Sequence, residues 1–152
     1  MWCGLSSKVP IAYIDARTFA HATEDSDKVQ TALMNTLPPE ASELVVFRKC
    51  NVAGHYGNPI LLLEARIKDK HVVQGIIVKW SSGLSIMDKE LLGDEIDRHL
   101  EKGNLYLRFD KQSAYLNEIR IGETDPIHFK VHFKKSNVDQ IVGICREIGL
   151  IP

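Results

Sequence analysis

The sequence has little of what marks secreted, membrane-spanning or zinc-stabilised proteins. Only three of its 152 residues are cysteine, and they are widely spaced, which argues against a disulfide framework and a CxxC zinc site. The longest apolar run, residues 59–63, is far shorter than the roughly 20 residues of a membrane helix. The N-terminal segment has no basic start followed by a long apolar core. These absences predict a cytoplasmic protein without a membrane partner.

Catalytic and cofactor-binding motifs are missing as well. The sequence shows no Walker loop, dinucleotide fingerprint, nucleophile elbow or serine-based triad. His21, Asp25 and His55 lack the HxH and HExxH spacings of metal sites. His128 and His132 are four residues apart on an expected strand, which is too far for one ion. The sequence therefore predicts a non-enzymatic protein with no metal and no cofactor.

The charge is balanced, and the length fits one domain. Lysine and arginine number 19 against 20 aspartate and glutamate, a net charge of −1, so the whole protein is not a general polyanion binder. Binding to a nucleic acid would need a local basic patch. Apolar residues make up 44% of the chain, which is typical of a globular protein. We expect a single domain over residues 1–152 with a short N-terminal lead, residues 1–8.

Two hydrophobic periodicities alternate along the chain. Strand-like segments cover residues 9–22, 44–53, 60–68, 118–122 and 127–134, and another begins at residue 104. Helices are expected to start at four capping residues, Thr23, Asp69, Ser85 and Ser136. The helix from Ser85 is expected to end at Gly103. The pattern predicts an α+β domain, a mainly antiparallel sheet with helices on one face and the other face open.

The stretch 104–117 carries the first part of a candidate site. Apolar side chains there alternate with polar ones that include Tyr106 and Arg108. Because successive side chains of a strand point to opposite faces, one face can join a core while the other stays polar. Lys111 and Gln112 are expected to extend the polar surface towards a turn.

A second part of the site is a stripe of cations and imidazoles late in the chain. His128, Lys130, His132 and Lys134 alternate with four apolar residues, and no acid lies between them. If this strand is a neighbour of the strand that begins at residue 104, the two form one basic surface. Cations on a rigid scaffold can bind phosphates, and tyrosine and arginine planes can stack on bases. The competing interpretation is an ordinary solvated, charged face.

The turn Gly54-His55-Tyr56-Gly57-Asn58-Pro59 is expected to link two strands of a hairpin. Its glycines permit close backbone approach, so His55 and backbone N–H groups could meet a phosphate or a base. A tight turn without a ligand is the alternative. His21 is interpreted as a packed or capping histidine rather than a catalyst, and it is kept among the candidate RNA contacts.

Three stretches carry a resemblance to a known family: residues 21–25, residues 54–59, and Leu105 to Gln112. Together they resemble the archaeal predicted RNA-binding proteins described as exosome-associated subunits. The similarity runs from about Val9 to Lys135. It implies a fold like the double-stranded-RNA-binding domain, similar also to a large-subunit ribosomal protein that contacts ribosomal RNA. It further implies a role in RNA processing, RNA degradation or ribosome-linked metabolism.

We therefore expect a non-enzymatic RNA-binding protein whose partners are RNA and exosome or ribosomal components. A homodimer is compatible with the sequence. The candidate RNA contacts are Arg108, Lys111, Gln112, Lys130, Lys134, His128, His132, His55, Tyr56, Asn58, Tyr106 and His21. One alternative is a protein-interaction subunit that docks through its sheet face or C-terminal helix without touching RNA. The other is a hydrolase or nuclease that uses His21, His55 and Asp110.

Overall fold

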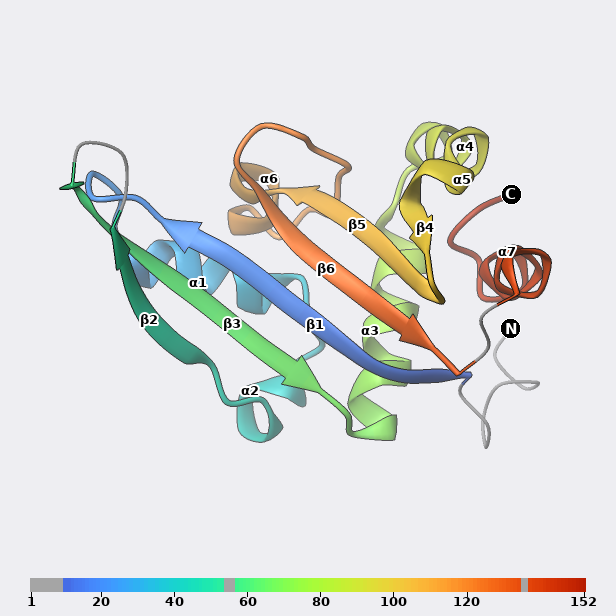
Figure 1. Ribbon diagram of the computed structural model, residues 1–152, viewed down its shortest axis with the longest axis horizontal. Coiled ribbons are helices and arrows are strands. Elements are labelled where there is room, and N and C mark those ends of the chain that lie inside the picture. Colours follow the sequence, from blue (N-terminus) through green and yellow to red (C-terminus); the bar gives the residue numbers. More distant parts are fainter. Residues whose placement is uncertain (1–9, 54–56, 135–136) are drawn as a thin grey trace.

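The computed structural model describes residues 10–53, 57–134 and 137–152 (Figure 1). The strands are β1 (Ile11–Ala20), β2 (Arg48–Ala53), β3 (Pro59–Ile67), β4 (Leu100–Glu101), β5 (Asn104–Asp110) and β6 (Pro126–Phe133). The helices are α1 (Ser26–Asn35), α2 (Ala41–Leu44), α3 (Lys70–Gly83), α4 (Ile86–Asp94), α5 (Ile96–His99), α6 (Lys111–Tyr115) and α7 (Val138–Glu147). No helix in these ranges is long and apolar enough to cross a membrane.

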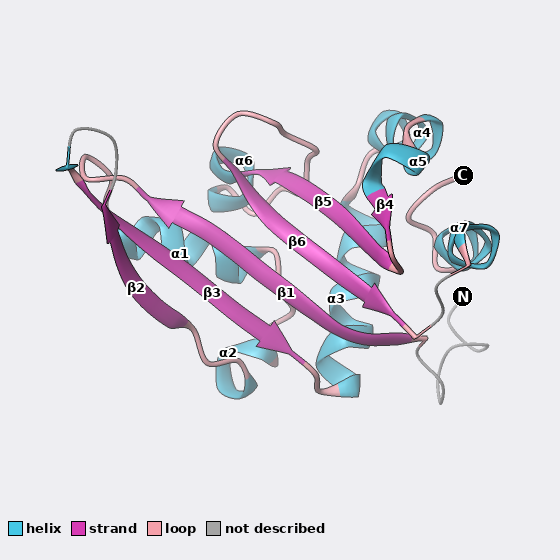
Figure 2. Ribbon diagram, in the orientation of Figure 1, coloured by secondary structure: helices cyan, strands magenta, loops and turns pink. Residues whose placement is uncertain are grey.

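The strands form one six-stranded sheet in the order β2-β3-β1-β6-β5-β4. Every strand pair in it is antiparallel. Helices α1 and α3 cover one face of the sheet, and α4, α5 and α7 lie beside its β4 end (Figure 2). The opposite face carries no helix from the described residues, and it is called the open face below. The expected α+β class, with an antiparallel sheet and helices on one face, is confirmed.

The core lies between the sheet and α3. The indole of Trp80 meets the ring of Phe109 at 5.1 Å and that of Phe129 at 4.7 Å, both edge to face. Such pairs add about 0.5–1.5 kcal/mol beyond the burial of their surface. The indole N–H donates to the carbonyl of Thr36 at 2.9 Å, so the one polar atom of this side chain is also satisfied. This packing fixes the helix layer to β5 and β6 and leaves their polar side chains facing away.

Two expected helix starts are confirmed by their capping bonds. Oδ1 of Asp69 accepts from the N–H groups of His71 and Val72 at the start of α3. Oγ of Ser85 accepts from the N–H of Asp88 at the start of α4. These bonds satisfy amides that have no partner within the helix.

The expected cap at Thr23 is wrong by two residues. A turn closed by the N–H of Glu24 and the carbonyl of His21, at 2.9 Å, occupies that stretch. The helix can begin only after this turn, and Oδ1 of Asp25 caps α1 by accepting from the N–H of Asp27.

Helix α7 also begins later than expected. Its N-cap is Asn137, whose Oδ1 accepts from the N–H of Gln140 at 3.2 Å; the expected cap, Ser136, lies outside the described residues. Ile141 and Cys145 are buried, as the apolar stripe predicts. Burial raises the pKa of the Cys145 thiol to about 12, so this thiol is a packing group.

The single helix expected between Ser85 and Gly103 is wrong. Helix α4 ends at Asp94, and the chain then forms α5 and the short strand β4. Leu100 of β4 pairs with Leu105 of β5, so the backbone here pairs with the sheet edge instead of continuing a helix. Gly103, with φ of 81°, completes the turn between the two strands.

Two further strand expectations change. Strand β2 begins four residues later than expected, because α2 occupies the preceding loop. Residues 118–122 form only a bridge between Ile121 and Phe109 in place of a strand. Gly122 lies so close to β5 that a Cβ there would be 2.8 Å from the Cα of Asp110. Only glycine permits this approach, which holds the returning chain against the end of β5.

Candidate functional site

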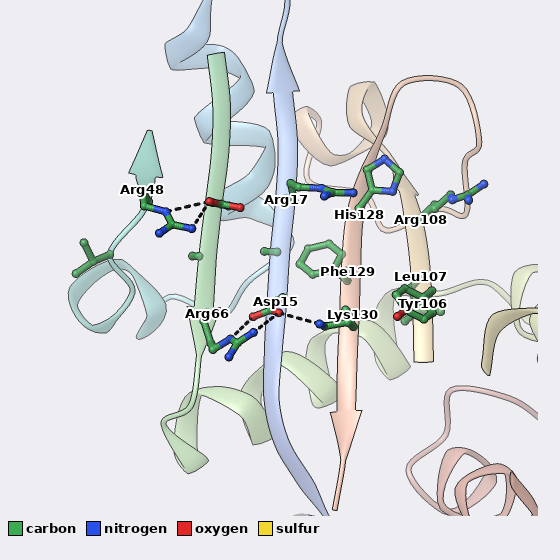
Figure 3. A pocket seen from close by; sticks show the side chains of 14 residues that line it. Asp15, Arg17, Arg48, Arg66, Tyr106, Leu107, Arg108, His128, Phe129 and Lys130 are labelled. Carbon is green, nitrogen blue, oxygen red and sulfur yellow. Dashed lines mark hydrogen bonds and ion pairs between the residues drawn. The ribbon is translucent and has the colours of Figure 1, made fainter. Parts of the chain in front are cut away.

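The open face is hollowed to a volume of about 830 Å³ (Figure 3). Its lining residues come from strands β1, β2, β3, β5 and β6 and from the segment before β2. They are Asp15, Ala16, Arg17, Val46, Arg48, Glu64, Ala65, Arg66, Tyr106, Leu107, Arg108, His128, Phe129 and Lys130. Charged side chains dominate, so the hollow suits a polar or ionic ligand better than an apolar one.

The two strands that carry the expected site are neighbours. Strands β5 and β6 pair so that Arg108 lies opposite His128, and Tyr106 lies opposite Lys130. Directly opposite residues project to the same side of a sheet. The structure therefore brings these four predicted residues together on the open face.

Asp15 neutralises much of the charge at one end of the hollow. Its carboxylate accepts two bonds from the guanidinium of Arg66, at 2.8 and 3.0 Å, and lies 3.5 Å from the ammonium of Lys130. The hydrogen bond to Asp15 raises the pKa of Arg66, which stays charged. The guanidinium of Arg48 donates through two nitrogens to one oxygen, Oε1, of Glu64 (Figure 3). Arg48, Arg66 and Lys130 thus each have a carboxylate partner on this face.

Two other cations of the open face have no such partner in the described part of the chain. Arg17, His128 and Arg108 lie side by side on β1, β6 and β5 in register, and we call them the arginine row. Among residues 10–53, 57–134 and 137–152, no carboxylate lies within ion-pair distance of Arg17 or Arg108, and both are exposed. Their N–H donors are free for an anion such as a phosphate.

His128 lies between these two guanidinium groups. Burial lowers the pKa of its imidazole, and the charges of Arg17 and Arg108 lower it further, while Asp125 opposes them. The imidazole is consequently neutral at pH 7. It offers one donor and one acceptor nitrogen at the centre of the arginine row.

Aromatic rings on the open face differ in their exposure. Tyr13 is stacked on the ring of His132 with centroids 4.8 Å apart, and the guanidinium of Arg66 lies 4.0 Å above its centroid. Nδ1 of His132 is in turn 2.6 Å from Oδ1 of Asn104. These contacts hold His132 within the sheet surface. The ring of Tyr106 is 40% exposed and is free to contact a base or a sugar.

Lys111 does not extend the polar surface of β5, so that expectation is wrong. Asp110 ends the strand by capping α6, and Lys111 turns inward, with only 8% of its side chain exposed. Its ammonium donates to the carbonyl of Phe19 at 2.8 Å, to Asp125 at 2.8 Å and to Glu24 at 3.2 Å. This buried ammonium joins three chain segments and is not offered to a ligand.

Gln112 also lies away from the open face. It is exposed on α6 and lines a smaller hollow of about 390 Å³ against α1, on the helix side of the sheet. Lys134 is exposed just beyond β6, where its backbone N–H donates to the carbonyl of Pro10. Asn58 is exposed at the start of β3. His55 and Tyr56 lie outside the described residues.

His21 belongs to a polar cluster at the end of β1. Its Nε2 lies 3.0 Å from Oδ1 of Asp125, and its backbone N–H donates to Glu24. Burial alone would raise the pKa of Asp125, but hydrogen bonds from Lys111 and His21 outweigh burial and hold it below the usual range. His21, Glu24 and Asp125 are close enough to share a metal ion. The ammonium of Lys111 already serves as the cation among these carboxylates.

The sequence reasoning missed several residues of the hollow, among them Asp15, Arg17 and Arg48. Arg17 and Asp15 lie on β1, on the same face as Tyr13 and Phe19. The alternation of β1 could have revealed them, since residues two apart share a face. The Asp125 cluster gave no such signal, because Asp125 is 104 positions from His21.

Relatives with similar sequences and folds come from archaea. The "RNA-binding protein PAB1135" of Pyrococcus abyssi is 37% identical over 133 residues, 86% of each chain. The crystal structure of protein AF2318 from Archaeglobus fulgidus has a TM-score of 0.77 at 27% identity, over 91% of this chain and 99% of that one. Mth689 of Methanothermobacter thermautotrophicus, a DUF54 protein, has a TM-score of 0.75 at 28% identity, over 91% and 98% of the two chains.

The match to a known family covers most of the chain. A sequence profile described as "RNA binding" matches residues 13–133, which include β1 from Tyr13 onward, the other five strands and the whole arginine row. With this match and the Pyrococcus relative, the chain belongs to the archaeal RNA-binding family that contains PAB1135.

Proposed function

We propose that the protein binds RNA on its open face, without catalysis, and that the arginine row is the main phosphate contact. The observation that carries this proposal is the pair of unpartnered guanidinium groups, Arg17 and Arg108, held on adjacent positions around β6. The paired antiparallel strands fix the spacing of the two guanidinium groups. Both groups can therefore contact one RNA backbone without a loop having to become ordered. Guanidinium forks bind phosphate oxygens with two parallel hydrogen bonds.

The neighbouring side chains complete the contact. Lys130, shared with Asp15, supplies a third cation, and the exposed ring of Tyr106 lies opposite it on β5. A tyrosine in that position can stack on a base or contact a ribose. The imidazole of His128 can donate a hydrogen bond in its neutral form. A phosphate beside it would favour the charged form, in which both ring nitrogens donate.

The finer role rests on resemblance. The resemblance of residues 21–25, 54–59 and 105–112 to a family described as exosome-associated supports a role in RNA processing, RNA degradation or ribosome-linked metabolism, with exosome or ribosomal components as partners and the cytoplasm as location. The name of the Pyrococcus relative supports RNA as the ligand. No step in this role requires a metal or a cofactor.

Alanine variants test the site through fluorescence anisotropy with a labelled RNA that has both a stem and a single-stranded tail. Arg17→Ala and Arg108→Ala should each weaken binding at low salt about 5- to 10-fold, because each removes a charge-assisted phosphate contact. Arg146→Ala, an exposed arginine on α7 with the same change of net charge, should change affinity less than about 2-fold. Equal losses in all three variants, or no binding by the natural protein, would contradict the proposal.

In the same assay, Asp15→Asn should strengthen RNA binding instead of weakening it. Losing this carboxylate frees Arg66 and Lys130 from their ion pairs, so RNA affinity should rise about 3- to 10-fold. A gain of affinity cannot come from misfolding. Weaker binding by Asp15→Asn would show that the open face is not where the RNA lies.

A further inference from the structure

Strand β2 is an edge strand with an unpaired outer side. It pairs only with β3 in the described sheet, and no helix covers its outer edge (Figure 1). All of its residues except Val52 are exposed. Backbone N–H and C=O groups along such an edge are a template for another strand. The other edge, β4, has only two residues.

The charges of β2 are gathered at one end. Arg48 and Lys49 begin the strand, and Val52 and Ala53 end it without charge. A second copy of β2 laid parallel would place cation against cation. Laid antiparallel, the cationic end of each copy meets the neutral end of the other, so the edge is self-complementary in that direction only.

Symmetry then limits the register. Two identical antiparallel edge strands are related by a two-fold axis perpendicular to the sheet, so one residue must face itself. Lys49 cannot be that residue without opposing two ammonium groups. Centring on Cys50 places Arg48 against Val52 and Lys49 against Asn51, so both cations face a neutral residue within β2. Centring on Asn51 would place Arg48 beyond Ala53, the end of the opposite strand.

We propose that β2 pairs antiparallel with β2 of a second copy of this chain, in the register centred on Cys50. The axis keeps both open faces on the same side, so the two sheets form one continuous twelve-stranded surface. Two arginine rows then lie on one face, and a longer RNA can contact both at once. The interface is small and has few apolar side chains, so the dimer is weak, with Kd of roughly 10–100 µM.

Disulfide trapping without RNA tests the pairing separately from RNA binding. Cα atoms of directly opposite residues lie about 4.5–5.5 Å apart, within the range for a disulfide. The full chain carrying Cys3→Ser, oxidised near the expected Kd, should form a Cys50–Cys50 dimer that mass spectrometry identifies. The buried thiol of Cys145 is protected by its raised pKa. A matched control, Cys3→Ser/Cys50→Ser/Lys28→Cys, moves the exposed thiol to α1 and should cross-link at least 10-fold more slowly.

Charge variants at Val52 test the register by sedimentation. Val52→Lys places an ammonium opposite Arg48 of the second copy and should raise the dimer Kd about 10-fold, whereas Val52→Glu should leave it unchanged or lower it. Equal effects of both variants would overturn the register. Cross-linking no faster than in the α1 control, with a monomer at every concentration, would overturn the dimer and leave the RNA-binding proposal standing.

Discussion

At the scale of single residues, the neighbours of a cation decide whether it can bind a ligand. Arg66 and Arg17 are both arginines on the open face, but Asp15 holds Arg66 in a two-pronged ion pair. Arg17 has no such partner in the described part of the chain, and neither has Arg108. The function of this face therefore depends on where its two carboxylates lie as much as on its cations.

At the proposed site, His128 should make RNA binding sensitive to pH. Its pKa lies below the ordinary 6.5, through burial and the charges of Arg17 and Arg108, with Asp125 opposing. A bound phosphate favours the charged ring and raises that pKa, so binding takes up a proton. Affinity should therefore rise as pH falls, and because the pKa in the free protein is lowered, the rise should continue to a lower pH than an unperturbed histidine would give.

Anisotropy titrations at several pH values, with circular dichroism to verify folding, measure this response. His128→Gln should flatten it, and the control His71→Gln, an exposed histidine at the start of α3, should not. A response that survives His128→Gln would place the titrating group elsewhere.

The sequence predicts where a side chain lies when that depends on one strand alone, but not when it depends on contacts between distant segments. Strand alternation alone places Tyr106 and Arg108 on the polar face of one strand and His128 and Lys130 on the polar face of another, and the pairing of β5 with β6 brings the four together. The fate of Lys111 depends on carboxylates from two other segments that fold back on it. Local sequence holds no signal of such contacts.

At the scale of elements, periodicity located the helices and strands but not their ends. The stripe of α3 and the alternation of β6 were both predicted, since each repeats over several turns or pairs. Most failures are at element ends, namely the start of α1, the start of β2, and the break between α4 and α5, whereas the strand expected at residues 118–122 is only a bridge. Element ends depend on single capping bonds and on pairing with distant strands, which compete with local preference.

Lys111 ties the ends of three elements together. Lys111→Met keeps the stem and removes the ammonium that binds Asp125, Glu24 and the end of β1. The free energy of unfolding in urea at pH 7 should fall by about 2 kcal/mol, less than for a fully buried pair because both carboxylates reach water. Lys134→Met, an exposed lysine, should change it by less than about 0.5 kcal/mol.

The difference in unfolding free energy between the natural protein and Lys111→Met should become smaller at acidic pH. The folded-state pKa of Asp125 is below its usual 3.8, so its contribution is present above that value and is lost as pH falls through the folded pKa. A difference between the natural protein and Lys111→Met that stays constant down to acid unfolding would show that the ammonium does not act through these carboxylates.

At the scale of the whole molecule, the order of the strands creates the site. The strand β1, first in sequence, lies between β3 and β6 and so brings Arg17 beside His128, 111 positions later. Hydrophobic pattern gave the fold class and the open face, but it contains no information on which strands are neighbours. Net charge, at −1, gave no hint of a basic patch; the patch exists because the fold separates paired from unpaired cations.

The central claim is that RNA lies on the open face, and photo-cross-linking with 4-thiouridine RNA followed by mass spectrometry of the linked peptides tests it most directly. We predict cross-links to β1, β5 and β6, foremost to Tyr106 and to the residues around Arg17 and His128. Cross-links confined to α1, α3, α4 or α7, with none on the open face, would contradict it.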